Sequence, residues 1–351
     1  MDPVERRLLE RTWFPVARVE DVARGAVHAS ILGADLVVYR AGGVTTVAGA
    51  SCPHRGAALW MGAVGAGGLE CPYHGWRFEA GTGRCVHVPS LPPGSRPPRA
   101  ALGVLPVREA YGHVWSCLDR PLGPPPEMLG LSAGWQLAYG EPADVGCGMR
   151  QLTENFRDLA HFPFVHHRTM GPGVRRVVEP YAVRRDGWRL TWTSSVDLGG
   201  TALEGRSAVA GRQTVEYHLE VPMFAYAYTS FPEGGRRLVA QFTTPIAADG
   251  LRVRQFWVVG VDEVVAAGHG VSLTEMCDYE RRIFEEDHPI VENQRPLEAP
   301  LATSTQAHTR ADRFSLAYRR LYAELLATLG KEVADAADDA DPHAVSAAEG
   351  R

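Results

Sequence analysis

Short apolar runs separated by glycine dominate the first third of the chain. Runs of this length at regular spacing, with turn residues between them, are typical of strands in a small antiparallel β structure. The runs lie at 27–32, 35–39, 44–47, 84–88, 104–107 and 113–118. The pattern therefore predicts an N-terminal β domain.

A second strand-rich region covers residues 178–260. Two Asp-Gly pairs stand between apolar runs in it, and such a pair is a strong hairpin signal because glycine takes the positive φ that a tight turn needs. The pairs are Asp186-Gly187, between 181–185 and 188–194, and Asp249-Gly250, between 238–243 and 253–259. We expect an antiparallel sheet in this half of the chain.

A segment with the apolar spacing of a helix precedes this predicted sheet in the sequence. Leu152, Phe156 and Leu159 form an apolar stripe, which predicts a helix that starts at 151. Pro163 should end or kink this helix near Phe162, because proline lacks the N–H that continues the hydrogen-bond ladder.

Two further helices are predicted after the sheet. Ser272 and Glu275 form a possible capping box, and the positions that follow recur at helical spacing: Met276, Glu280, Ile283 and Asp287. A terminal helix is expected over 312–329, where tyrosine and leucine recur at the same spacing. The element order, strands and then helices around a second set of strands, predicts an α+β fold.

The boundary between the two halves is expected in the proline- and glycine-rich stretch 121–134, which reads as a semi-rigid linker. This division predicts a first domain at 1–120 and a second domain at 135–330. The segment 331–351 is acidic, rich in alanine and free of aromatic residues, and we expect it to be disordered.

Composition narrows the class of protein. With 351 residues, 45% of them hydrophobic, the chain can bury one large core or two ordinary ones. The net charge is −5 and no basic block occurs, which argues against nucleic-acid binding. The charged N-terminus lacks a secretory signal, and no run of about 18 apolar residues predicts a membrane span. We therefore expect a cytoplasmic protein.

Candidate chemistry begins with two cysteine–histidine pairs, in each of which proline directly follows the cysteine. The two stretches are Cys52-Pro53-His54-Arg55-Gly56 and Cys71-Pro72-Tyr73-His74-Gly75-Trp76. Two thiolates and two imidazoles are the ligand set of the Rieske form of the 2Fe-2S cluster. A structural zinc site also accepts this set, but the C-x-H spacing is tighter than that of zinc fingers and no recognition helix follows.

A second candidate site lies on the helix predicted from 151. Asn155, Asp158 and His161 follow one another at intervals of three, and a break at Pro163 lets His166 turn back towards His161. Two histidines and one carboxylate bind Fe(II) in mononuclear non-haem oxygenases. On spacing alone this string is a weak signal for a metal site.

Residue patterns alone do not decide which carboxylate is the third ligand of this second site. Asp287 shares a helix face with Met276 and Ile283, and a carboxylate facing a core is costly to bury unless a cation neutralises it. Glu285, Glu286 and Asp287 also fit an ordinary solvated acidic run.

The paired motif resembles the Rieske family, and the segment from Asn155 to His166 is similar to the catalytic-iron motif of Rieske non-haem iron oxygenases. The resemblance extends from Trp13 to about Leu329. It implies an N-terminal Rieske β domain and a C-terminal helix-grip (START-like) catalytic domain with an antiparallel sheet.

The resemblance also implies a role for each candidate residue. It implies 2Fe-2S ligands at Cys52, His54, Cys71 and His74; Fe(II) ligands at His161, His166 and Asp287; and a bridge at Asp158 to the cluster of a neighbouring subunit. Glu286 is the alternative to Asp287, and His167 the alternative to His166. Asn155 matches a position near the iron in part of the family.

The activity that follows from the resemblance is oxidation of a small organic substrate by O2. Because no glycine-rich dinucleotide motif is present, electrons from NAD(P)H must come through a separate reductase or ferredoxin. The family works head to tail around a ring, so we expect a homotrimer. A monooxygenase or demethylase is the first hypothesis, an aromatic ring cis-dihydroxylase the second, and an electron carrier without oxygenase activity the third. Phe162, Phe164 and Val165 are candidate pocket residues.

Overall fold

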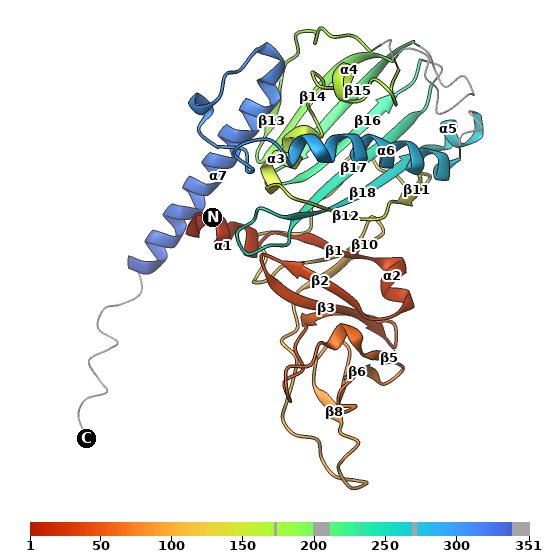
Figure 1. Cartoon of the computed structure of the whole chain (residues 1–351), viewed down its shortest axis with the longest axis vertical. Helices are drawn as coiled ribbons and strands as arrows, with labels where there is room; N and C mark the ends of the chain where they lie inside the picture. The colour runs from red at the N-terminus through yellow and green to blue at the C-terminus, as the bar shows by residue number, and fades with distance from the viewer. Residues whose placement is uncertain (172–173, 199–210, 233, 269–271, 339–351) are drawn as a thin grey trace.

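Three small antiparallel sheets form the N-terminal part of the protein, seen at the bottom of Figure 1. The structure is a computed structural model that describes residues 1–351 apart from 172–173, 199–210, 233, 269–271 and 339–351. The strand orders are β2-β3-β4, β5-β6-β7-β8 and β1-β10-β9. The strands are β1 (Phe14–Arg18), β2 (Val27–Ile31), β3 (Ala34–Ala41), β4 (Val44–Gly49), β5 (Ala63–Gly65), β6 (Gly68–Glu70), β7 (Arg77–Phe78), β8 (Cys85–His87), β9 (Val107–Ala110) and β10 (His113–Ser116).

The predicted β domain is confirmed, with one strand displaced. The run at 104–107 forms no strand of its own, and β9 begins only at Val107. Val104 makes an isolated bridge to Ala48, and Leu105 donates its N–H to Val47. Pro106 then interrupts the pairing because it has no N–H to donate.

An eight-stranded antiparallel sheet forms the second half, in the order β11-β18-β17-β16-β15-β14-β13, and β12 also pairs with β18. Both predicted hairpins are confirmed: β13 pairs with β14 across Gly187 (φ 55°), and β17 pairs with β18 across Gly250 (φ 77°). The strands are β11 (Gln136–Tyr139), β12 (Ala143–Val145), β13 (Arg184–Asp186), β14 (Arg189–Leu198), β15 (Gly211–Glu220), β16 (Phe224–Ser230), β17 (Arg236–Pro245) and β18 (Val253–Val261).

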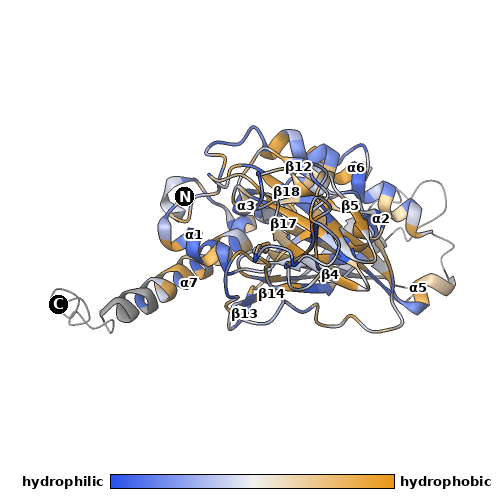
Figure 2. Ribbon diagram, turned by 90° about the horizontal axis from the view of Figure 1, so that it is seen from below, coloured by the Kyte–Doolittle hydropathy of each residue, from blue (hydrophilic) through white to orange (hydrophobic). Residues whose placement is uncertain are grey.

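Helix α6 (Leu273–Val291) crosses one face of this sheet (Figure 1). The predicted capping box is present: Ser272 accepts from the Glu275 N–H, and the Glu275 carboxylate accepts from the Ser272 N–H. The buried face of α6 includes Met276, Ile283 and Asp287, as its spacing predicted. Figure 2 shows α6 with both hydrophilic and hydrophobic stretches, as expected of a helix with one face on the sheet.

The N-terminal helix lies against the C-terminal one. Helix α1 (Pro3–Glu10) contacts α7 (Arg313–Asp338), and Tyr322 donates its hydroxyl to Glu5 at 3.0 Å. Helix α7 continues past the predicted end at 329 to Asp338. The first residues of the chain therefore pack on the C-terminal half.

The proline-rich stretch between the halves is also packed. Met128 is buried, the Leu129 N–H donates to the Tyr226 hydroxyl at 2.9 Å, and Trp13 donates its ring N–H to Gly123 at 3.0 Å. The largest hydrophobic core contains residues from both halves.

The remaining helices are α2 (Val19–Arg24), α3 (Met149–Asn155), α4 (Phe162–Val165), α5 (Glu263–Gly268), η1 (Leu59–Met61), η2 (Thr303–Thr305) and η3 (Arg310–Asp312). Within the described ranges, no helix has the length and apolar character to cross a membrane.

The expectation of one helix from 151 to about 162 is wrong. Helix α3 ends at Asn155, and a separate short helix, α4, begins at Phe162 with Pro163 in its first turn. The Asp158 carboxylate accepts from the Ala160 N–H at 2.8 Å, so a local side-chain turn replaces the helix between them. Pro163 begins a helix because the first turn has no intrahelical use for its missing N–H.

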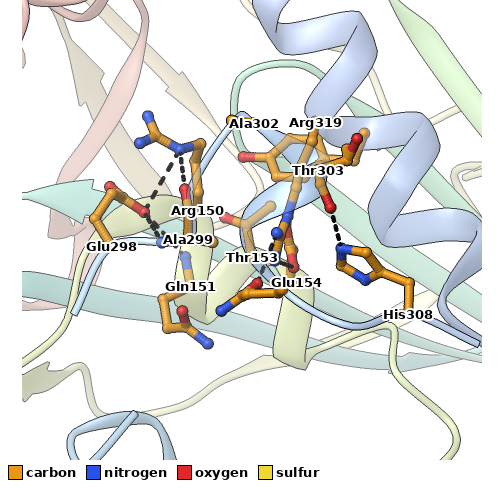
Figure 3. Close-up of polar contacts among 12 residues, drawn as sticks. Arg150, Gln151, Thr153, Glu154, Glu298, Ala299, Ala302, Thr303, His308 and Arg319 are labelled. Carbon is orange, nitrogen blue, oxygen red and sulfur yellow. Dashed lines mark hydrogen bonds and ion pairs between the residues drawn. The ribbon is translucent and has the colours of Figure 1, made fainter. Parts of the chain in front are cut away.

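Buried polar contacts hold α3 in place (Figure 3). Arg319 of α7 binds both carboxylate oxygens of Glu154, at 2.6 and 2.8 Å. Arg150 donates to the Ala299 carbonyl at 2.8 Å, and the Gln151 N–H donates to Glu298 at 3.2 Å. A bidentate arginine–carboxylate pair restricts rotation as well as position. These contacts fix the end of α3, where Asn155 lies.

Candidate metal centres

The two cysteine–histidine pairs lie on loops of the same conformation. Cys52 follows β4, and Cys71 lies between β6 and β7. In each loop the carbonyl of the cysteine accepts from the glycine four residues later, Gly56 at 2.8 Å and Gly75 at 3.0 Å. Both glycines have positive φ, 70° and 66°, which other residues rarely adopt. The repeated Cys-Pro-x-x-Gly order therefore produces two matching turns.

The matching turns bring the four side chains together. Cys52 and Cys71 are buried, and the His54 and His74 ring centroids are 4.7 Å apart. Burial, and then the adjacent Cys71 thiol, raise the pKa of Cys52 despite backbone hydrogen bonds that lower it. Nδ1 of His54 is buried and has no hydrogen-bond partner among the described residues. Two thiols and two imidazoles facing one another, one with an orphaned ring nitrogen, fit the donor set of a Rieske cluster.

The second site is a triangle of donor atoms. Nε2 of His161 lies 3.0 Å from Nε2 of His166, and Oδ1 of Asp287 lies 3.3 Å from each. Ligands bound at about 2.1 Å to one metal are about 3.0 Å apart when they occupy neighbouring octahedral corners. The three residues therefore can hold one metal ion, and all their donor atoms occupy one side of it.

The triangle joins the two ends of α4 to α6. His161 is the N-cap residue of α4, His166 directly follows α4, and Asp287 comes from the last turns of α6. His166 is completely buried and Asp287 is 4% exposed. His167, the alternative to His166, is exposed and directs Nδ1 to the Phe164 carbonyl.

The electrostatics of the triangle favour a cation. Burial lowers the pKa of His161, but hydrogen bonds to Asp158 and Asp287 outweigh burial and raise it to about 9. Burial raises the pKa of Asp287, but both histidines outweigh it and lower the pKa to about 2. Positive charge is thus stabilised between these groups, and a metal ion binding there displaces the proton.

A carboxylate stands behind each histidine. Asp158 Oδ2 lies 3.4 Å from Nδ1 of His161, and Glu286 Oε2 lies 2.9 Å from Nδ1 of His166. Thr169 donates to the other oxygen of Glu286 at 2.9 Å. A carboxylate at Nδ1 orients a ligand imidazole and leaves Nε2 as the metal-facing atom. Glu286 therefore lies behind His166 and is not one of the three residues of the triangle. The sequence pattern did not reveal this orienting role.

We expect Glu286→Gln to weaken iron binding at the triangle by about 10- to 100-fold, the usual cost of losing a partner of a ligand histidine. The measurement is iron retention against a chelator series. Glu285→Gln is the matched control, because its neighbouring carboxylate is exposed and pairs with Arg281 at 2.9 Å. Equal iron retention in the two variants would contradict the positioning role.

A cavity of about 100 Å³ opens beside the triangle. Phe162 lines it, whereas Phe164 is 59% exposed and lies beside Arg176, and Val165 borders a different cavity. Of the three candidate pocket residues, only Phe162 is thus correct. The wall also contains Asn155, which donates to Asp287 Oδ1 at 3.1 Å.

The same wall carries two charged residues that sequence patterns did not identify. Arg237 comes from β17 and Glu280 from α6, and their side chains pair at 3.4 Å. Burial raises the pKa of Glu280, although Arg237 opposes the change. The helical spacing of Glu280 with Asp287 was the only signal that could have placed Glu280 in the pocket.

Two protein families match this chain. A Rieske 2Fe-2S domain matches residues 12–107, and the vanillate O-demethylase oxygenase C-terminal domain matches residues 145–328, more than half of the chain. The N1- and N3-demethylases of methylxanthines from Pseudomonas putida, NdmA and NdmB, are each 26% identical to it and cover 92% of this chain and 90% of their own length. The oxidoreductase NdmD of the same organism is 40% identical over 119 residues, 20% of its length.

Solved structures share the whole architecture. NdmA with caffeine superposes with a TM-score of 0.77 at 24% identity and covers 92% of both chains. Dicamba monooxygenase bound to dicamba superposes with a TM-score of 0.68 at 19% identity, covering 92% of this chain and 99% of that one. The α+β fold class, with a Rieske β domain and a catalytic antiparallel sheet, is confirmed. The chain belongs to the Rieske oxygenases, in the family whose catalytic half is the vanillate O-demethylase oxygenase C-terminal domain.

Proposed function

We propose that this protein is the oxygenase component of a demethylase, which hydroxylates an N- or O-methyl group of a small organic substrate. The observation that carries the proposal is the His161–His166–Asp287 triangle, whose donor atoms lie 3.0–3.3 Å apart at the wall of a cavity. Two histidines and a carboxylate would hold Fe(II) and would leave it open positions at which O2 could react. Three relatives carry demethylase names: NdmA, NdmB and dicamba O-demethylase of Stenotrophomonas maltophilia.

The overall reaction balances with one O2, two electrons and two protons. A methyl group on nitrogen or oxygen gains one oxygen atom, the second oxygen atom leaves as water, and the hydroxymethyl product releases formaldehyde. When bound, the Fe(II) supplies the O2 chemistry. The protein contributes the three ligands, the carboxylates of Asp158 and Glu286 that orient the histidines, and a largely apolar cavity that excludes water.

Electrons are proposed to enter at Cys52, His54, Cys71 and His74 from a separate NAD(P)H-dependent reductase or ferredoxin, the kind of partner that the likeness to NdmD suggests. In Figure 1 the strands that flank these ligands lie at the opposite end of the molecule from α4 and α6. Asp158 lies behind His161 and borders a polar cavity of about 370 Å³. This arrangement supports transfer to the triangle from the cluster of another subunit, with Asp158 as the bridge in a cytoplasmic homotrimer.

The test is turnover with an external reductase. We expect about three irons per chain, two from a Rieske cluster and one from the triangle. We also expect NADH-driven O2 uptake that releases formaldehyde from N-methyl or methoxy compounds. Two irons per chain would indicate an electron carrier. A product that keeps its methyl group and gains two hydroxyls would indicate a ring dihydroxylase, the class that 3-chlorobenzoate-3,4-dioxygenase of Comamonas testosteroni represents among the relatives.

A further inference from the structure

An ion pair lies inside the cavity beside the proposed iron site. Arg237 of β17 and Glu280 of α6 line the same wall as His161, His166 and Asp287. Glu280 is only 6% exposed. Charged side chains are seldom placed in such a cavity unless something balances them, because burial removes their hydration. Here each is balanced by the other, and both border the space that a substrate must fill.

The pair leaves hydrogen-bonding capacity unused. Its single contact joins Arg237 Nη2 to Glu280 Oε2 at 3.4 Å, near the long limit for a hydrogen bond. Nε of Arg237 is buried and has no partner among the described residues. By contrast, Arg319 and Glu154 make two bonds at 2.6 and 2.8 Å. A structural ion pair is satisfied in this second way, whereas the Arg237–Glu280 pair presents a donor and an acceptor that are incompletely used.

The charges of Arg237 and Glu280 limit which substrate group can bind beside them. A carboxylate next to Arg237 would also lie near Glu280 and Asp287, and a permanent cation next to Glu280 would lie near Arg237. The pair together has no net charge, so it complements a neutral group that accepts from the guanidinium and donates to the carboxylate. A C=O with an adjacent N–H has this pattern. The rest of the wall is mainly apolar and aromatic, and includes Val215, Val239 and Ile283.

We propose that Arg237 and Glu280 are specificity-determining residues that select neutral substrates with an amide-like edge, such as a carboxamide, lactam or imide, and reject carboxylic acids. Arg237 donates to the substrate carbonyl, and Glu280 accepts from its N–H. The inference rests on the proposed function, since it assigns the substrate class of that same pocket. It sets this protein apart from a demethylase of aromatic acids.

The experiment compares three probes that share one methoxy-phenyl body: 4-methoxybenzamide, methyl 4-methoxybenzoate and 4-methoxybenzoate. The first has both a carbonyl and N–H groups, the second has only acceptors, and the third is an anion. Affinity is measured by calorimetry on the iron-loaded protein without reductase, so that binding is read independently of turnover. We expect the carboxamide to bind at least about tenfold more tightly than the acid, the ratio that a hydrogen bond to a charged group provides.

Two variants separate the two roles. Glu280→Gln removes the negative charge and should raise the affinity for the acid about tenfold. Arg237→Met should weaken the carboxamide and the ester alike, by about tenfold, because methionine has no N–H to donate to either carbonyl. Glu220→Gln is the matched control, since Glu220 pairs with Arg189 at 2.7 Å on the same sheet but does not line this cavity. The cluster absorbance and the melting temperature check that each variant is folded.

Equal affinity of the wild-type protein for carboxamide and acid, or no binding of the carboxamide, would overturn the inference. So would an unchanged selectivity in both Glu280→Gln and Arg237→Met. These results are distinct from failure of the proposed function. Turnover of all three probes with formaldehyde release but without selectivity rejects the inference alone, whereas selective binding with no formaldehyde from any probe rejects the demethylase activity alone.

Discussion

We expect Asp287→Ala to lose the mononuclear iron and all turnover, while the absorbance spectrum of the Rieske cluster stays unchanged. Asp287 is 4% exposed, and its Oδ1 is 3.3 Å from Nε2 of both His161 and His166. Without it, two neutral imidazoles remain, and they lack the negative charge that stabilises a divalent cation in a buried site. Metal analysis should show the loss of one iron per chain, and O2 uptake with reductase and substrate should fall to background.

The matched control is Glu285→Ala on the same helix, because the Glu285 side chain is 55% exposed and pairs only at the surface, with Arg281. This variant should keep its full iron content and its activity. Wild-type turnover in Asp287→Ala would refute Asp287 as a ligand. Loss of the cluster spectrum in the same variant would show instead that the substitution disturbs the whole fold.

The second large effect is expected from Asp158→Asn: with iron supplied in excess this variant should keep both metals, but electron transfer between them should slow by about 10- to 100-fold. The asparagine oxygen can still accept from the Ala160 N–H, so the turn before α4 is preserved. The variant loses the negative charge that lies 3.4 Å from Nδ1 of His161. Rapid mixing of the reduced protein with O2 and substrate measures the effect as the rate at which the cluster is reoxidised.

Asp312→Asn is the control for this variant. Asp312 borders the same polar cavity but hydrogen-bonds to Thr309, and its amide analogue keeps an acceptor oxygen there. We expect an unchanged reoxidation rate in this control. An equally unchanged rate in Asp158→Asn would remove the bridge role, and a loss of iron that excess iron does not restore would limit Asp158 to the support of His161.

The Rieske loops were the part of the site most open to prediction from sequence. Each Cys-Pro-x-x-Gly stretch contains its own turn, because Gly56 and Gly75 supply the positive φ and close a hydrogen bond to the cysteine four residues earlier. Such geometry depends only on neighbouring residues in the chain, so it can be predicted from a short stretch of sequence. The hairpins at Gly187 and Gly250 and the capping box at Ser272 were predictable for the same reason.

The segment between Asn155 and His166 shows where local reasoning fails. Spacing of three residues predicted one helix with Asp158 and His161 on a common face, but α3 ends at Asn155 and His161 begins a new helix. The two residues still meet, because the turn between them brings Nδ1 of His161 to 3.4 Å from Asp158. The predicted contact between Asp158 and His161 is thus present, although the continuous helix from which it was predicted is not. The end of α3 depends on tertiary contacts with α7 and with residues 298–299, which no local pattern contains.

By itself, the sequence determined the ligand types, the two matching loops, the order of strands and helices, and the helix face on which Asp287 lies. Only the tertiary structure decided which acidic residue faces the histidines and which stands behind them, because the neighbours Asp287 and Glu286 meet different nitrogens of His166, Nε2 and Nδ1, about 120 residues away in the chain. It also brought Arg237 and Glu280 together as an ion pair by packing α6 across the sheet, against β11 and β18. Periodicity can assign a residue to a face, but distances between faces exist only after the helix has packed on the sheet.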